Sequence, residues 1–168
     1  MLISQICNEC CCFVGRGVKS GYGVNLEVNI LKRFELLVED MFKVYALRRD
    51  SGKCDILDFF TVSDVNREEL KERNNMLARL EKIAMGKKLL PAVCHRVDDD
   101  HKLWQIRTDK YRLIWFYDRS HIIICTNVFS KRKSGSTPYR HLERARKLRE
   151  EYFKARESGT VEFIDDCD

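Results

Sequence analysis

The sequence predicts an α+β fold in which helices pack on one face of a mainly antiparallel sheet. Three observations support this class. A run of β-forming residues precedes a long segment of helical periodicity, three short apolar runs joined by polar turns follow, and a second helical segment comes last. No repeating βαβ alternation is present, so a parallel sheet is not expected. The other face of the sheet is expected to remain free for binding.

The first half of the chain contains two predicted helices and one predicted strand. Apolar residues at helical spacing between Ile30 and Met41 predict a short amphipathic helix. The β-forming run after it predicts a strand over residues 42–49, which ends at a turn-like cluster. Asn66, followed three residues later by Glu69, is typical of a helix start and opens a long amphipathic helix.

The second half predicts a sheet followed by a helix. The runs "KLWQIR", "YRLIWFYD" and "HIIICTNVFS" are separated by short polar turns, which favours a three-stranded antiparallel meander. Thr137 offers an N-cap, and Pro138 suits the first helical position. The helix that they start is expected to end near Ser158 and Gly159.

Composition divides the chain into three parts. Residues 1–40 carry a cysteine cluster and a glycine-rich loop, and they are expected to form an extension that is either disordered or precedes a true start at Met41. Residues 41–156 hold 27 basic and 16 acidic side chains, a net charge of +11, and are expected to form the globular domain. Residues 157–168 form an acidic tail. A domain this basic indicates a polyanionic partner, although a merely solvated surface is the alternative.

The cysteines do not form the framework of a secreted protein. Four of the eight fall within residues 7–12 and the others are scattered, and no signal peptide precedes them, so a reducing cytoplasm is expected. Cys94 and His95 do not complete a zinc site at any usual spacing, and we expect no metal and no cofactor. No apolar run is long enough to span a membrane. His95 and His101 flank "RVDDD", which fits a solvated loop better than a metal or acid–base pair.

Basic residues gather where the predicted strands end. The candidates are Arg107, Lys110, Arg112, Lys131, Arg132, Lys133 and Arg140, together with the phenol of Tyr139. Neighbouring strands lie about 5 Å apart, so these side chains can meet, although the register that decides their facing is not fixed by the sequence. Such a set suits RNA cleavage by the 2′-hydroxyl, because guanidinium groups hold the phosphate while a phenol or a lysine moves protons. The alternative is a solvated basic turn with edge-strand charges.

An ordered set of short motifs carries a resemblance to a known family. It comprises Leu103-Trp104-Gln105-Ile106-Arg107, Tyr111-Arg112, Phe129-Ser130-Lys131-Arg132, Thr137-Pro138 and, in the last helix, Ala145-Arg146. This set resembles the core of the RelE/HigB superfamily of type II toxin–antitoxin toxins, in particular its phage-derived, HigB-like branch. The resemblance extends more weakly upstream to about Met41.

The resemblance implies a compact RNase-like fold and a ribosome-dependent endoribonuclease, an mRNA interferase whose expression arrests growth. It also implies mRNA and the ribosome as partners and a cognate antitoxin, expected to be of the helix-turn-helix type. By position, Arg112 and Arg132 match phosphate-binding residues, Lys131 lies beside them, and Tyr139 lies one residue from the place of a stacking or acid–base tyrosine.

The same comparison keeps two other functions open. RelE-like members carry catalytic lysines on the strand where this chain has Leu103 and Gln105. Without those lysines, the chain can also be a non-catalytic, ParE-like inhibitor of DNA gyrase or a basic RNA-binding module. Codon preference and oligomeric state are not predicted.

Overall fold

The computed structural model describes residues 31–62, 64–119, 121–131 and 136–165. The described elements, in chain order, are β1 (Lys32–Glu39), β2 (Lys43–Arg48), α1 (Asp55–Thr61), α2 (Arg67–Ala84), β3 (Cys94–Asp98), β4 (Leu103–Arg107), β5 (Tyr111–Asp118), β6 (Ile122–Ser130), α3 (Tyr139–Glu157) and β7 (Val161–Ile164). The strands form one seven-stranded sheet in the order β3-β4-β5-β6-β2-β1-β7. The α+β class is therefore confirmed, with a larger sheet than the predicted meander.

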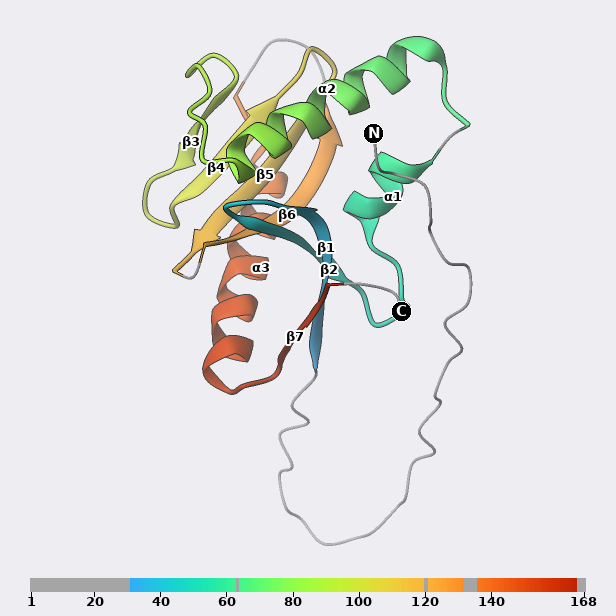
Figure 1. The fold of residues 1–168 in the computed structure, drawn as a ribbon. Coiled ribbons are helices and arrows are strands. Elements are labelled where there is room, and N and C mark those ends of the chain that lie inside the picture. The colour runs from blue at the N-terminus through green and yellow to red at the C-terminus, as the bar shows by residue number, and fades with distance from the viewer. Residues whose placement is uncertain (1–30, 63, 120, 132–135, 166–168) are drawn as a thin grey trace, which may run out of the picture.

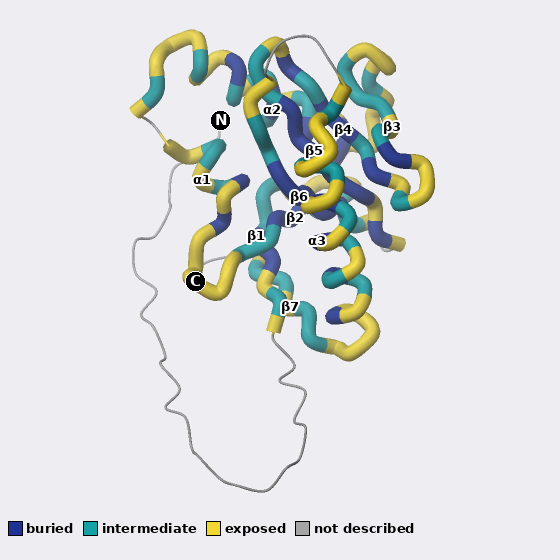
Figure 2. The backbone as a smooth tube through the Cα atoms, turned by 180° about the vertical axis from the view of Figure 1, so that it is seen from behind, coloured by how far each residue is buried: buried dark blue, intermediate teal, exposed yellow. Residues whose placement is uncertain are grey.

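Helices cover both faces of the sheet (Figure 1), so the prediction of a free face is wrong. Side chains alternate between the faces along each strand. Val44 and Ala46 pack with the buried residues of α1 and α2, whereas Tyr45 between them packs with those of α3. Strands β5 and β6, at the centre of the sheet, consist largely of buried residues (Figure 2). Apolar residues therefore run almost unbroken along these two strands, as expected for a sheet buried on both sides.

The predicted three-stranded meander is confirmed, and a further strand pairs with it on each side. Strands β4, β5 and β6 pair antiparallel in sequence order, and β3 extends the sheet beside β4. The predicted strand over residues 42–49 is β2, which lies parallel to β6. Parallel neighbours need a crossover connection, and the segment from α1 to β5 supplies it.

The predicted helix between Ile30 and Met41 is wrong, because residues 32–39 form strand β1 within the segment assigned to the extension. Phe34 packs toward α3 and Leu37 toward α2, with a register irregularity between Leu36 and Val38. Burial on both faces places apolar residues at positions that also fit a helical period. The acidic tail likewise contains strand β7, which lies parallel to β1. The ring of Phe163 in β7 lies against Tyr45, tilted by 44° and at 4.6 Å between ring centroids.

The ends of the long helices follow local chemistry. Asn66 caps α2 as predicted, since its side-chain oxygen accepts from the backbone N–H of Glu69 at 2.9 Å. Helix α3 begins at Tyr139 with Pro138 as N-cap, one residue later than predicted, because the hydroxyl of Thr137 donates to Gln105 Oε1 at 2.6 Å instead of capping. The C-terminal end is confirmed, with Ser158 as C-cap and a φ of 69° at Gly159.

Two buried carboxylates tie α3 to the sheet. Asp98 of β3 accepts from Arg146 Nε at 2.5 Å, and Asp118 at the end of β5 accepts from the hydroxyl of Tyr152 at 2.7 Å. Arg156 also pairs with Asp118. Both carboxylates are buried, so their charges depend on these partners.

No described helix is both long and apolar enough to cross a lipid bilayer. In the same residues no group of three or more His, Cys, Asp and Glu side chains is placed to hold a metal ion. The cysteine cluster at residues 7–12 lies outside the described residues.

The carboxylate of Asp98 predicts an acid-sensitive fold. Burial alone would raise its pKa, but hydrogen bonds from His101 and Arg146 outweigh burial and lower the pKa to about 2. A carboxyl with a depressed native pKa stabilises the fold above its unfolded pKa, and this contribution disappears as the pH falls. Between about pH 5 and about pH 2, we expect Asp98 to contribute about 2 kcal/mol to the loss of unfolding free energy. Asp98→Asn should remove that part of the slope in urea titrations.

Asp99→Asn is the matched control, because the neighbouring Asp99 side chain is 88% exposed and pairs only loosely with Arg96. Its pH dependence should remain that of the unaltered protein. Equal slopes for the Asp98→Asn variant and the unaltered protein would contradict the assignment.

A chain that begins at Met41 tests the contribution of β1. It lacks Phe34, whose side chain is 1% exposed and lies edge-on to Tyr152, and it leaves β2 and β7 without the strand between them. Loss of one buried Phe side chain costs about 3–5 kcal/mol. We expect the unfolding free energy in urea to fall by at least this amount relative to a chain that begins at Leu31. Equal stability of the two chains would show that β1 is dispensable.

Candidate functional site

The hairpin between β4 and β5 brings two arginines together. Arg107 and Arg112 are directly paired across the strands, so their side chains share one face of the sheet. This face is the one covered by α3, because Ile114, next but one to Arg112, packs against that helix. Burial, and then the charge of Arg107, lower the pKa of Arg112. Like charges directly opposite each other are unfavourable to each other.

His95 of β3 joins the arginine pair. Arg107 Nη2 lies 2.8 Å from His95 Nδ1 and 3.0 Å from Nε2. Because a guanidinium only donates, one of the two ring nitrogens must accept, which requires a neutral imidazole. Burial, followed by the charges of Arg107 and Arg112, lowers the pKa of His95, in agreement with that state. His101 lies elsewhere and contacts Asp98.

A second histidine lies where β6 ends and α3 begins. Phe129 pairs with Arg112 across the strands, and its ring is stacked on His141 at 3.7 Å between centroids with an interplanar angle of 5°. Arg140 Nε donates to His141 Nε2 at 3.3 Å. Burial, and then the charges of Arg140 and Arg144, lower the pKa of His141. His141 is therefore an uncharged imidazole within a cationic surface.

Some of these groups line a small hollow of about 40 Å³. Its lining residues are Arg112, Phe129, Ser130, Lys131, Ser136, Pro138, Arg140 and His141. The cationic side chains come from two strands and one helix start, so the hollow exists only in the folded domain. A space of this size admits the oxygen atoms of one phosphate better than a whole nucleotide.

The structure brings together part of the predicted set. Arg107 and Arg112 share a face, and Lys131 and Arg140 line the hollow with Arg112. Lys110 is turned away, because its ammonium pairs with Glu68 of α2 at 2.9 Å.

Three further predicted residues are not among the described members of this group. Tyr139 does not line the hollow: it is 67% exposed, and its ring centroid lies 6.0 Å from the guanidinium carbon of Arg146. Arg132 and Lys133 lie outside the described residues.

Both aromatic residues of the hollow were missed by sequence reasoning. Phe129 was read only as part of a family motif, and His141 was not considered. The available signal for His141 was its position three residues after Pro138, on the first turn of the predicted helix. Its neighbours on the sheet could not be predicted, since they depend on how α3 docks.

Gln105 has a structural position. It is 1% exposed, and its Oε1 accepts from the Thr137 hydroxyl, which fixes the segment leading into α3. Leu103 on the same strand is fully buried against α3. Neither residue faces solvent, so the positions that hold lysines in RelE-like members do not belong to an accessible surface here.

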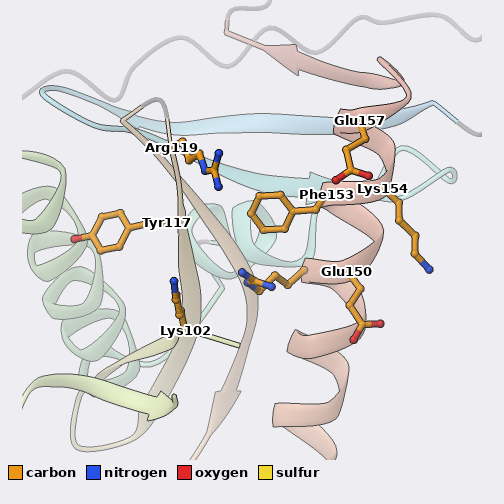
Figure 3. A pocket seen from close by; sticks show the side chains of 8 residues that line it. Lys102, Tyr117, Arg119, Glu150, Phe153, Lys154 and Glu157 are labelled. Atoms are coloured by element: carbon orange, nitrogen blue, oxygen red, sulfur yellow. The ribbon is translucent and has the colours of Figure 1, made fainter. Parts of the chain in front are cut away.

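A second hollow, of about 490 Å³, lies toward the C-terminal end of α3 (Figure 3). Lys102 and Arg119 point toward the ring of Phe153, whereas Glu150 and Lys154 point away from it. The lining mixes cations with carboxylates and contains no histidine. None of the predicted site residues that the structure describes lines it, so we place the candidate site at the Arg107–Arg112 end.

The candidate site can therefore hold an anion and move a proton. Paired guanidinium groups donate to phosphate oxygens in a fixed fork. A neutral imidazole beside them accepts a proton at physiological pH.

The part of the chain that carries these residues matches a known family. The family model of the phage-derived protein Gp49-like (DUF891) matches residues 64–150, which run from just before α2 into α3 and include every candidate residue named above. No curated protein matches the chain. The Gp49-like family belongs to the RelE/HigB-like toxin superfamily, whose toxins have antitoxin partners. Since the match spans just over half of the 168 residues, the chain belongs to the Gp49-like family of phage-derived proteins.

Proposed function

We propose that this chain is the toxin of a type II toxin–antitoxin system, on the HigB-like branch, and that it cleaves mRNA on the ribosome. One observation carries the proposal: Arg112, which is paired across the strands with Arg107, lines a small hollow together with His141, whose pKa is lowered. This combination supplies both phosphate binding and a proton acceptor. The family membership supports a toxin.

In the proposed reaction the RNA supplies its own nucleophile. His141 accepts the proton of a 2′-hydroxyl, whose oxygen attacks the adjacent phosphorus. The bond from phosphorus to the 5′-oxygen breaks, which leaves a 2′,3′-cyclic phosphate and a 5′-hydroxyl. Arg112, with Arg107 and Arg132, stabilises the charge that grows on the phosphate oxygens. Lys131 or Tyr139 protonates the leaving oxygen, and Lys133 and Arg140 hold the RNA backbone.

The ribosome supplies the remaining orientation. The strand that carries lysines in RelE-like members offers only buried Leu103 and Gln105 here. An enzyme with so few proton-transfer groups depends on a substrate that is already held in line for attack. We therefore propose translated mRNA as substrate, a cytoplasmic site of action, and neutralisation by a cognate antitoxin of the helix-turn-helix type.

The buried Leu103 and Gln105 also fit a second function, inhibition of DNA gyrase. A ParE-like inhibitor of DNA gyrase needs no general base, so it would tolerate Leu103 and Gln105. Primer extension on cellular mRNA after induction separates the two functions. Cuts within translated codons support the nuclease, whereas intact message with gyrase-dependent DNA damage supports the inhibitor.

The first prediction for this site concerns the phosphate clamp. Arg112→Ala removes a guanidinium from the growing charge, so we expect cleavage of ribosome-bound mRNA to slow by about 100-fold or more and growth arrest to disappear. Arg112→Lys keeps the charge without the planar fork and should restore only part of the rate. Circular dichroism must show native folding for both variants.

Arg33→Ala is the matched control for charge, because Arg33 is exposed and pairs with Glu162 far from the candidate site. Its toxicity should be unchanged. Full toxicity of the Arg112→Ala variant would refute the site assignment.

The second prediction concerns pH. A general base works only when it is unprotonated, and the pKa of His141 is lowered below 6.5. The cleavage rate should therefore stay high near neutral pH and fall as the pH decreases through that lowered pKa. His141→Gln should remove this acid limb and slow cleavage by about 100-fold. Single-turnover rates on ribosome-bound mRNA measure both effects.

His121→Asn is the control for this experiment, since His121 is exposed and lies against Phe42 instead of the arginines. Its profile should match that of the unaltered protein. An acid limb that persists without His141 would assign the titration to another group.

A further inference from the structure

A third hollow, of about 400 Å³, lies on the α2 side of the sheet. It is formed by the C-terminal end of α2, the segment that follows this helix, and the adjoining face of β4 and β5. Its lining residues are Phe42, Ile83, Gly86, Lys87, Lys88, Leu89, Pro91, Cys94, Trp104, Trp115 and Tyr117. We call this hollow the aromatic pocket. The Arg107–Arg112 pair faces α3, so the sheet separates the pocket from the candidate RNA site.

Aromatic side chains form one wall of the aromatic pocket. Trp104 is stacked on Trp115 at 5.8 Å between centroids with an interplanar angle of 20°, and Tyr117 meets Trp115 edge-on at 4.6 Å. Phe42 lies 5.5 Å from Tyr117. Concave sites lined by aromatic and aliphatic groups bind apolar side chains or ligands.

Exposed apolar residues surround the aromatic pocket. Eight large apolar residues are exposed in the described part of the chain, and four of them belong to this region: Met41, Met85, Leu90 and Tyr117. Tyr117 lines the pocket, Met41 lies against Gly86, and Met85 and Leu90 adjoin lining residues in the chain. Exposed apolar residues gathered in one region are typical of a surface that binds another protein.

The charge at the pocket indicates the partner. Lys87 and Lys88 are the charged members of the described lining, and no carboxylate lies among them. Apolar anchors flanked by cations complement an amphipathic segment that carries Asp or Glu around bulky apolar residues. Single-stranded RNA fits less well, because bases need exposed ring faces and Trp115 is 1% exposed.

We propose that the aromatic pocket docks an acidic amphipathic helix of the antitoxin, with one bulky apolar side chain inserted beside Trp104. The proposal deepens the proposed toxin function and rests on it for the identity of the partner. A helix docked on this face leaves Arg107 and Arg112 accessible. Docking here anchors the antitoxin, and a different part of the complex must block RNA cleavage.

The chain contains its own probe for this pocket. Its two tryptophans are Trp104 and Trp115, and both line the pocket, so all intrinsic tryptophan emission reports on it. The experiment selects a displayed library of random short peptides on the full-length protein. We expect the enriched peptides to be acidic, with apolar residues at i and i+4. Titration of a tryptophan-free enriched peptide should shift the emission to shorter wavelength and saturate.

Charge-reversal variants test the site. Lys87→Glu with Lys88→Glu should weaken peptide binding by about tenfold or more. The matched control, Lys53→Glu with Lys71→Glu, changes the net charge equally at exposed positions away from the pocket lining and should bind as the unaltered protein does. Equal binding by the two double variants would overturn the proposal, as would the absence of any enriched acidic peptide.

Two further outcomes would also overturn it. An oligouridine that gives the same emission shift and displaces the peptide would make the pocket an RNA site. A shift that depends on protein concentration without peptide would make it an interface between two copies of this chain. Cleavage by the Lys87→Glu, Lys88→Glu variant is measured in parallel. A protein that binds the peptide but never cuts RNA would refute the nuclease and leave the docking site standing.

Discussion

The pairing register of β4 with β5 is the constraint on which both proposed surfaces depend. Side chains alternate across a sheet, so one fixed pair assigns every residue of both strands to a face. Trp104 opposite Trp115 directs the indoles toward α2, and the same register places Arg107 opposite Arg112 toward α3. A slip of one residue would exchange the two surfaces and place guanidinium groups beneath the apolar side of α2. The fully buried residues between these pairs prevent such a slip, because each would then meet the wrong helix.

The direct cross-strand pairing of two arginines has an electrostatic cost. Two guanidinium groups across from each other repel, and burial of Arg112 strengthens that repulsion. His95 offsets part of the cost by accepting from Arg107 as a neutral ring. Local costs of this kind persist where the surrounding fold holds the groups in place, and they are typical of binding sites. An anion between the arginines would reverse the sign of the interaction.

The elements that neighbouring residues determine could be predicted from the sequence. Strand β2, the Asn66 cap, the meander and the end of α3 follow from periodicity, capping and turn residues. Strand β1 was mistaken for a helix because it is buried on both faces, and β7 was missed because its partner lies more than a hundred residues away. The same division applies to the site. Arg107 and Arg112 were recognised by residue type, whereas the stacking of His141 on Phe129 arises only when α3 docks on β6.

The parallel pair of β1 and β7 has a consequence for the timing of activity. The first strand of the described sheet meets its partner only after residues 161–164 have been synthesised. Contacts between such distant segments are entropically expensive and slow a domain's folding. Until then the ring of Phe34 lacks Phe163 as a neighbour, and the edge of β1 is open. A nascent chain with this connectivity therefore stays incompletely folded until β7 has been synthesised, so the domain becomes active only after this strand has joined the sheet.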